Sequence, residues 1–266
     1  PRTNGYINFL SNNENYIDIF GGPHTASIGM DGKTLDSTFD LSMKYSEEKK
    51  RTSAFEFRGE DGITIEFWYK PFDVSGIKTI FHVSGSSVDF DRRTGNFFIQ
   101  QNGANIKFSM RSGSSNLVQE DFATTETDVW NHYAVTVLSS SSGLRIKGYK
   151  NGNFVYDQLR SSSGYNIPHI LPSLGGLNAR IGNNFLSTQP LSGAIDEFRF
   201  WKTERSSEQI FNNWFTHVGG GTNNYDSNVS LGCYLKFNEG ITGNNALDEI
   251  ALDYSGRINN GVIKNY

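Results

Sequence analysis

Asp196 is the residue whose type and position point most directly to chemistry. It lies in the stretch 191–201, which reads Leu-Ser-Gly-Ala-Ile-Asp-Glu-Phe-Arg-Phe-Trp. Alternation along an extended chain predicts that Asp196 shares one face with Phe198 and Phe200. A carboxylate beside an apolar layer is unfavourable unless it accepts hydrogen bonds, pairs with a cationic side chain or binds a metal ion. Asp196 is therefore the candidate metal ligand. A carboxylate satisfied by backbone N–H groups or by an arginine is the equal alternative.

The sequence lacks the residue spacings typical of hydrolases. Retaining glycosidases need two carboxyl groups about 5 Å apart, whereas Asp196 and Glu197 are adjacent, so a strand points them to opposite faces. There is no Gly-x-Ser-x-Gly motif, and the histidines show no His-x-x-x-His spacing. Cys233 falls on the apolar face of 231–237, which predicts a buried core thiol. These observations predict a protein that is not an enzyme.

Aromatic and amide side chains near polar loops are the candidates for ligand contacts, because such groups stack on sugars and hydrogen-bond to them. The loops are 84–95 and 158–179, both rich in Ser, Gly and Asn. Trp68 lies on the polar face of its strand, where it either packs under a loop or offers a stacking platform. The candidate ligand-binding residues are Trp68, Phe90, Tyr165, His169, Asn183 and Asn184.

Many short alternating stretches separated by turn residues are expected to position these groups. The clearest is 63–71, in which Ile, Ile, Phe and Tyr alternate with Thr, Glu, Trp and Lys before a proline ends the strand. Further strands are expected at 5–20, 79–83, 97–110, 130–137, 144–157, 180–183 and 231–237. Ser206 and Gln209 have capping-box spacing, which predicts one short helix near 206–215.

Composition narrows the function classes. The chain has 266 residues, a formal charge of −4 and a pI near 5.8, which argues against a nucleic-acid partner. No run of 18 apolar residues exists, so no membrane span is expected. A single cysteine rules out an internal disulfide. Because the sequence begins at Pro1, we interpret it as a processed chain or a piece of a longer protein.

Several phrases of the sequence resemble a known family. Gly-x-Ile-Asp-Glu-φ-Arg-φ-Trp at 193–201, Ile-Thr-Ile-Glu-Phe-Trp-Tyr-Lys-Pro at 63–71 and Trp-x-His-φ-Ala-φ-Thr at 130–136 look like strands of laminin-G-like, concanavalin A-like jelly rolls. The opening hairpin at 5–20 and the terminal segment 231–263 are similar to those of the same family. The resemblance implies an all-β fold, a two-sheet antiparallel jelly-roll sandwich with the one short helix. It also implies a single domain over 1–266, with an insertion at about 21–60.

The resemblance carries functional expectations too. Such sandwiches often hold a structural Ca²⁺, which would place Asp196 and carbonyls near 12–15 around the ion. The expected function is a non-catalytic binding or adhesion module that recognises a glycan or a partner protein, extracellular or on a cell or virion surface. One alternative is a structural or host-attachment module built into a larger assembly such as a viral particle. The second alternative is a glycan-cleaving enzyme with a non-standard site.

Overall fold

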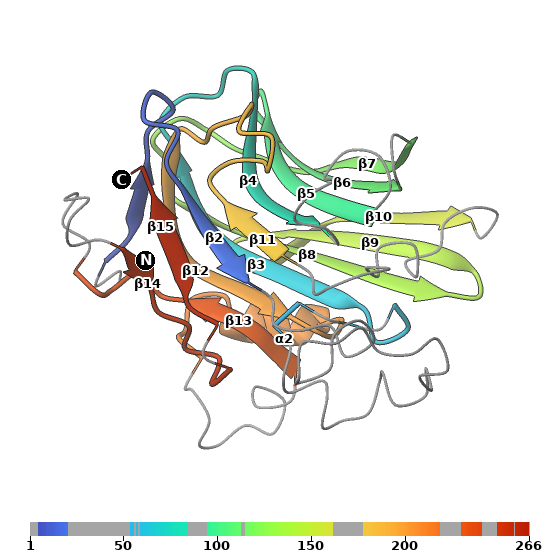
Figure 1. Cartoon of the computed structure of the whole chain (residues 1–266). Coiled ribbons are helices and arrows are strands. Elements are labelled where there is room, and N and C mark those ends of the chain that lie inside the picture. The colour runs from blue at the N-terminus through green and yellow to red at the C-terminus, as the bar shows by residue number, and fades with distance from the viewer. Residues whose placement is uncertain are drawn as a thin grey trace, which may run out of the picture.

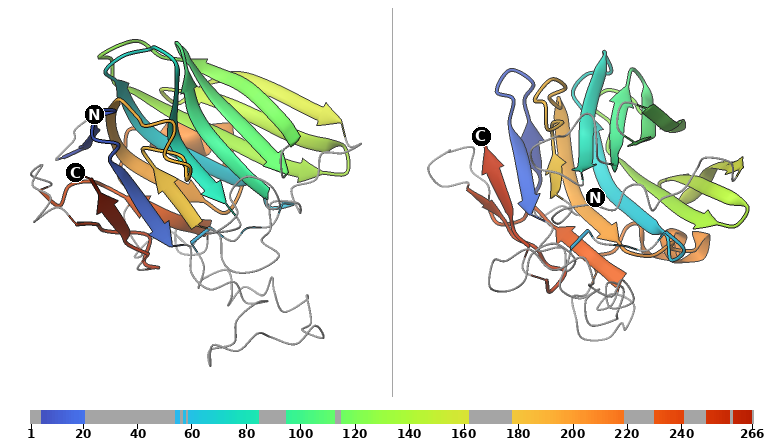
Figure 2. Two further views of the ribbon diagram at one scale, coloured as in Figure 1. Left: turned by 45° about the horizontal axis from the view of Figure 1, so that its top comes forward. Right: turned by 45° about the vertical axis from the view of Figure 1, so that its right-hand side comes forward.

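The structure, a computed structural model, describes residues 5–20, 54–55, 57, 59–84, 95–112, 115–161, 178–218, 230–240, 249–257 and 259–265. Within these residues the chain forms two antiparallel sheets that face each other (Figures 1 and 2). This arrangement confirms the predicted jelly-roll sandwich. The segment 21–53, most of the predicted insertion, lies outside the described residues, but Ala54, Phe55 and Phe57 at its end are buried in the core.

Sheet A has seven strands and includes the strand that carries Asp196. Its order is β1 (Ile7–Phe9), β12 (Gly193–Trp201), β3 (Ile63–Pro71), β8 (Asn131–Ser140), β9 (Gly143–Lys150) and β10 (Asn153–Ser161). β13 (Leu231–Leu235) pairs with the second half of β12. Since strands distant in sequence are neighbours here, side chains from β3, β8 and β12 meet on one face.

Sheet B has eight strands. Its order is β14 (Ile250–Ala251), β15 (Gly261–Lys264), β2 (Tyr16–Phe20), β11 (Asn178–Ile181), β4 (Ile77–Ser84), β5 (Gly95–Asn102), β6 (Asn105–Ser112) and β7 (Ser115–Thr124). The last strand, β15, pairs with β2, as the resemblance implied.

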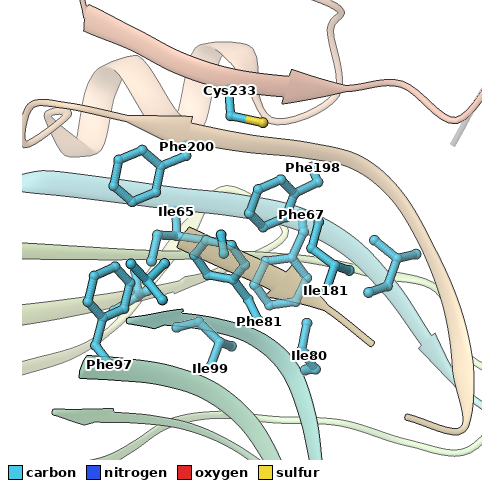
Figure 3. Packing of buried hydrophobic residues seen from close by; sticks show 14 of the residues in the cluster. Ile65, Phe67, Ile80, Phe81, Phe97, Ile99, Ile181, Phe198, Phe200 and Cys233 are labelled. Atoms are coloured by element: carbon cyan, nitrogen blue, oxygen red, sulfur yellow. The ribbon is translucent and has the colours of Figure 1, made fainter. Parts of the chain in front are cut away.

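The core lies between the two sheets and is built by the alternation seen in the sequence. Phe198 and Phe200 point from β12 toward Phe81 and Phe97 of sheet B (Figure 3). The Phe81 and Phe198 ring centroids are 4.7 Å apart. Cys233 is fully buried beside them, which confirms the predicted core thiol, and this burial raises its pKa. Each buried side chain of this size contributes about 1.5–3 kcal/mol.

The predicted helix is confirmed as α2 (Ser207–Asn213). The side chain of Ser206 accepts from the N–H of Gln209, and the Gln209 side chain accepts from the N–H of Ser206, so the predicted capping box is complete. Ile210 packs on Ala134 and Tyr149, which fixes α2 on the outer face of sheet A. Within the described part of the chain, no helix is long and apolar enough to cross a membrane.

The predicted phase of β12 is wrong at one point. Asp196 does not share a face with Phe198 and Phe200. The reason is that the residue pairing between β12 and β3 shifts between Asp196 and Arg199, where Glu197 has φ +52°. This bulge inserts one residue, so Ile195 and Phe198 both enter the core. Asp196 therefore lies on the outer face of sheet A rather than in the apolar layer.

Candidate functional site

A row of aligned side chains, most of them polar, crosses the outer face of sheet B. The alternating core residues on each strand leave their neighbours pointing outward. The strand registers then align these neighbours across β2, β11, β4, β5 and β6, which lie side by side in Figure 1. The aligned residues are Asp18, Arg180, His82, Phe98 and Ser109. Five strands from four separate parts of the sequence thus build one outward-facing row.

Four rings and one guanidinium group on this face contact one another in series, and we call this series the ladder: Tyr16, Arg180, Phe185, His82 and Phe98. The ring planes of His82 and Phe98 are stacked, whereas those of Phe185 and His82 are tilted by 56°. The guanidinium carbon of Arg180 lies 3.7 Å from the Tyr16 ring centroid and 5.0 Å from that of Phe185. The ring centroids of Phe185 and His82 are 4.7 Å apart, and those of His82 and Phe98 are 3.9 Å apart. Stacking of this kind orients flat groups and stabilises them.

Arg180 is locked in the ladder by its hydrogen bonds. Its Nε and Nη2 donate to the two carboxylate oxygens of Asp18, at 2.7 and 3.1 Å. Its Nη1 donates to the carbonyl of Asn184 and to Oγ of Ser187. A bidentate guanidinium–carboxylate pair is both strong and directional. The Asp18 carboxylate is still 38% exposed, so it can accept further hydrogen bonds from a ligand.

The loop 182–190 carries Phe185 over the sheet, and the two asparagines predicted as ligand contacts build this loop. Asn183 Oδ1 accepts from the N–H groups of Asn184 and Gln189, and Asn183 is fully buried. Asn184 Oδ1 accepts from the N–H of Thr188, and its Nδ2 donates to Oγ1 of Thr188. The structure thus places both side chains in hydrogen bonds that shape the loop 182–190, which we call the platform loop.

The other predicted ligand contacts from loops fall outside the described residues. These are Phe90, Tyr165 and His169. Three of the four described ends of these segments lie together, because Ser84 pairs with Asn96 and with Asn178 at one end of the central strands of sheet B. The segment 85–94 therefore begins and ends at this place, and the segment 162–177 ends there but begins after Ser161, at the end of β10 in sheet A.

Trp68 lies on the outer face of sheet A, away from the ladder. It is 8% exposed and packs against Trp214 at the end of α2, with ring centroids 5.4 Å apart, and against His132 at 5.7 Å. Asp196 is its register partner on β12. Two of the predicted site residues thus meet on this face, but Trp68 offers little surface for a sugar to stack on.

Asp196 is buried, and it accepts a hydrogen bond from the backbone of the next residue. Its Oδ1 accepts from the N–H of Glu197 at 2.8 Å. Burial, together with the charge of Glu197, raises its pKa to about 7, although that hydrogen bond and Arg199 act in the opposite direction. A carboxylate in this state would gain from a cation.

The predicted calcium site would bring Asp196 and the carbonyls near 12–15 around one ion. β1 pairs with β12, and this pairing ends where Phe9 lies opposite Gly193. Residues 12–15 follow that end of β1, and Asp196 lies three positions along β12 from Gly193. Among the described residues, no three acidic, histidine or cysteine side chains gather as a metal-binding group.

A buried charge cluster lies under α2 on the same outer face. Glu66 is 3.5 Å from His132 Nε2, 3.3 Å from Arg205 Nε and 3.8 Å from Arg199 Nη1. Arg199 Nη2 also donates to Glu197 at 2.8 Å and to the Thr216 carbonyl after the helix. The two carboxylates are thus neutralised by arginines, and the cluster fastens α2 to the sheet.

The residues of the ladder were not predicted as a site from the sequence. Tyr16, Asp18, Arg180, Phe185, His82 and Phe98 come from four separate stretches of the chain, and only the strand registers bring them together. A detectable signal existed in each strand, since each carries a polar or aromatic residue on its outward face. Which strands are neighbours could not be read from that signal.

Comparisons with known proteins agree with this architecture. A family model described as the concanavalin A-like lectin/glucanases superfamily, of the laminin-G type, matches residues 47–211. A sequence search of curated proteins found no match.

Solved structures match the chain at low sequence identity, and one of them, with a TM-score above 0.5, shares its fold. A candidate carbohydrate-binding protein from Bacteroides ovatus is 16% identical, with a TM-score of 0.54, and the match covers 97% of this chain but only 57% of the other. The sialyllactose-bound carbohydrate-binding module of a Ruminococcus gnavus sialidase is 15% identical, with a TM-score of 0.46, covering 58% of this chain and 83% of the module. Domain 4 of an extracellular arabinanase from Geobacillus stearothermophilus, in complex with arabinotriose, is 19% identical, with a TM-score of 0.43, covering 60% and 68%.

Proposed function

Because the chain belongs to the laminin-G-like family of the concanavalin A-like lectin/glucanase superfamily, we propose that it is a non-catalytic carbohydrate-binding module that acts outside the cell or on a surface. The Bacteroides ovatus protein of the same fold is described as a candidate carbohydrate-binding protein, which agrees with this proposal. The proposed ligand is a glycan, bound on the outer face of sheet B.

One observation carries the proposal: the ladder and the exposed carboxylate of Asp18 lie side by side on this face. Tyr16 and Phe185 are half-buried, so each ring keeps accessible surface. A sugar ring has apolar C–H faces that stack on aromatic rings and hydroxyl groups that hydrogen-bond to planar polar groups. Asp18 would accept from two hydroxyl groups while Arg180 holds it in place.

The test is a glycan array followed by calorimetric titration of the glycans that bind. Tyr16→Ala removes a stacking ring and Asp18→Asn removes the charged acceptor. We expect each change to weaken binding at least ten-fold, which corresponds to about 1.4 kcal/mol. Phe154→Ala, which removes a half-exposed ring on β10 of sheet A, should leave affinity unchanged. Equal binding by all four proteins, or binding lost only in Phe154→Ala, would exclude this face.

A second candidate function, a structural module in a larger assembly, is favoured by the edge strand β10. Phe154, Val155 and Leu159 on this strand are each about half exposed. An exposed apolar edge strand is a surface on which another chain can add a strand. The two functions are compatible, because β10 belongs to sheet A and the ladder belongs to sheet B.

A structural Ca²⁺ at Asp196 is also kept as a proposal, supported by the raised pKa of this carboxyl group. Ca²⁺ takes several oxygen ligands, and those besides Asp196 would have to come from groups that the structure does not place next to Asp196. The test is whether calcium raises the melting temperature of the protein but not that of Asp196→Asn. An equal response of both proteins would remove Asp196 from any calcium site.

A further inference from the structure

His82 is a titratable side chain in the middle of the ladder that the proposed sugar contacts do not use. It is 2% exposed, and its imidazole stacks on Phe98 with 20° between the ring planes. On its other side lies the ring of Phe185. Histidine is the side chain whose charge ordinarily changes between about pH 5 and 8. Because His82 contacts Phe185, a change in the charge of His82 would alter the surroundings of the loop 182–190.

The backbone of the platform loop uses His82 as a hydrogen-bond acceptor. The N–H of Phe185 donates to Nδ1 of His82 at 3.2 Å. Nδ1 therefore offers a lone pair, and the ring is the neutral tautomer with its proton on Nε2. A proton added to Nδ1 would turn it into a donor, which would then face the N–H donor of Phe185. Protonation of His82 and the hydrogen bond from Phe185 thus exclude one another.

Among the described residues, the charged groups nearest to His82 on its neighbouring strands are an arginine and the carboxylate paired with it. The register neighbour of His82 on β11 is Arg180, a cation, and Asp18 of β2 is already bound to Arg180. On β4 itself, Lys78 is paired with Asp73. The described neighbours on β5 carry no charge; they are Asn96, Phe98 and Gln100. A positive His82 would add a second cation to the ladder, and a loop that moves outward relieves this repulsion.

We propose that His82 is a proton-controlled latch, which holds Phe185 over sheet B when neutral and releases the loop 182–190 when protonated, so that the glycan is bound at neutral pH and let go in acid. The ligand part of this inference rests on the proposed function. The loop part does not, because it concerns one backbone hydrogen bond.

The first experiment follows the latch without a ligand. Nitrogen-15 NMR of the full chain, titrated from about pH 8 to pH 5, reports the ring nitrogens of His82 and the backbone amide of Phe185. We expect the Phe185 amide to lose its protection from hydrogen exchange as Nδ1 of His82 gains its proton. A Phe185 amide that stays protected after His82 is protonated overturns the latch.

Two variants separate the acceptor from the ring. His82→Asn keeps an acceptor near the position of Nδ1 and cannot titrate, so Phe185 should stay protected across the pH range. His82→Phe keeps the stack but has no acceptor, so Phe185 should be unprotected at every pH. His217→Asn, at a half-exposed histidine paired with Glu197 on sheet A, should leave the response unchanged. A variant with a lowered melting temperature is still informative, because the amide of Phe185 is read in the folded state.

The second experiment measures affinity for cellohexaose, maltohexaose and laminarihexaose at both ends of the pH range. We expect at least ten-fold weaker binding in acid for the wild-type protein, and pH-independent binding for His82→Asn. Persistent acid release in His82→Asn overturns the proposal. If none of these sugars or the array glycans binds at any pH, the proposed function fails, while the Phe185 amide still decides whether the latch exists.

Discussion

Two carboxyl groups on neighbouring strands of sheet A have pKa values displaced in opposite directions. Burial alone raises the pKa of both Glu66 and Asp196. For Glu66, His132 and the charges of Arg205 and Arg199 outweigh burial and hold the pKa at about 2. For Asp196, burial and the charge of Glu197 outweigh the hydrogen bond from the Glu197 N–H and the charge of Arg199, and the pKa reaches about 7. The difference shows that the cations around a buried acid, rather than its depth, decide its charge.

We predict that Glu66 makes the fold acid-sensitive. Its folded pKa of about 2 lies below the ordinary value of 4.5, so its contribution is complete above pH 4.5 and is lost as the pH falls toward 2. The loss over this window is about 3 kcal/mol. Urea unfolding at a series of pH values measures it. Glu66→Gln should remove this slope and should also destabilise the protein at pH 7 by about 3 kcal/mol, because two buried arginines lose a partner.

His132 acts in the same direction and provides a check. Burial, aided by the two arginines, lowers its pKa, against the effect of Glu66, so its contribution falls once the pH drops below the ordinary value of 6.5. The acid loss should therefore begin below pH 6.5 in both proteins, and only the further loss between pH 4.5 and 2 should be missing from Glu66→Gln. A wild-type stability that is flat between pH 4.5 and 2 would contradict the ion pairs under α2.

At the scale of elements, the strands and α2 were predictable and the bulge in β12 was not. α2 has a local signal, the Ser206–Gln209 capping box, and β3 has nine residues of clean alternation. The bulge depends on one residue, Glu197, in a positive-φ conformation. Alternation continues in the sequence on both sides of such a residue, so the pattern cannot show where its phase changes. The predicted face of Asp196 was wrong for this reason.

α2 is also held by a glycine in the hairpin between β9 and β10, which leads to a second prediction. Gly152 has φ +77°, and a Cβ there would overlap the indole of Trp214. Gly152→Ala should destabilise the protein by about 3 kcal/mol, since it combines a strained backbone with displaced packing. Gly240→Ala is the matched control, because Gly240 has φ +78° and open space around its Cβ position.

The control isolates the backbone part, expected at about 1 kcal/mol. Denaturant unfolding of the two variants measures the difference. Equal destabilisation by both substitutions would mean that Trp214 moves aside freely, and that the contact between α2 and the hairpin contributes little.

At the scale of the whole molecule, the two outer faces of the sandwich serve different ends. α2 packs on part of sheet A, and the charges of Glu66, Arg199 and Glu197 on that face are buried and paired. Sheet B keeps the ladder half-exposed at Tyr16 and Phe185. The sandwich itself could be predicted because each strand's alternation shows that one face is buried. The ladder could not, because the order of strands within a sheet is decided by long-range pairing.

The edges of the two sheets differ as well, and this leads to the last prediction. Edge strands usually carry charges or polar residues that discourage pairing with another chain. β7, at the edge of sheet B, follows this rule, with Gln119 and Asp121 pointing outward while Val118 and Phe122 are buried. β10, at the edge of sheet A, breaks it with Phe154, Val155 and Leu159. We therefore expect the chain to self-associate through β10 at high concentration, as sedimentation velocity would show.

Leu159→Lys should abolish this association without lowering the melting temperature, because a half-exposed side chain contributes little to the core and a lysine on an edge strand opposes pairing. Leu10→Lys is the control: Leu10 is 47% exposed against 48% for Leu159, but it lies in the turn after β1 rather than on β10. If both lysines weaken the association equally, it is a general effect of surface charge. If the wild-type chain stays monomeric at the highest soluble concentration, β10 is not a self-pairing edge, and any assembly must use a different chain as its partner.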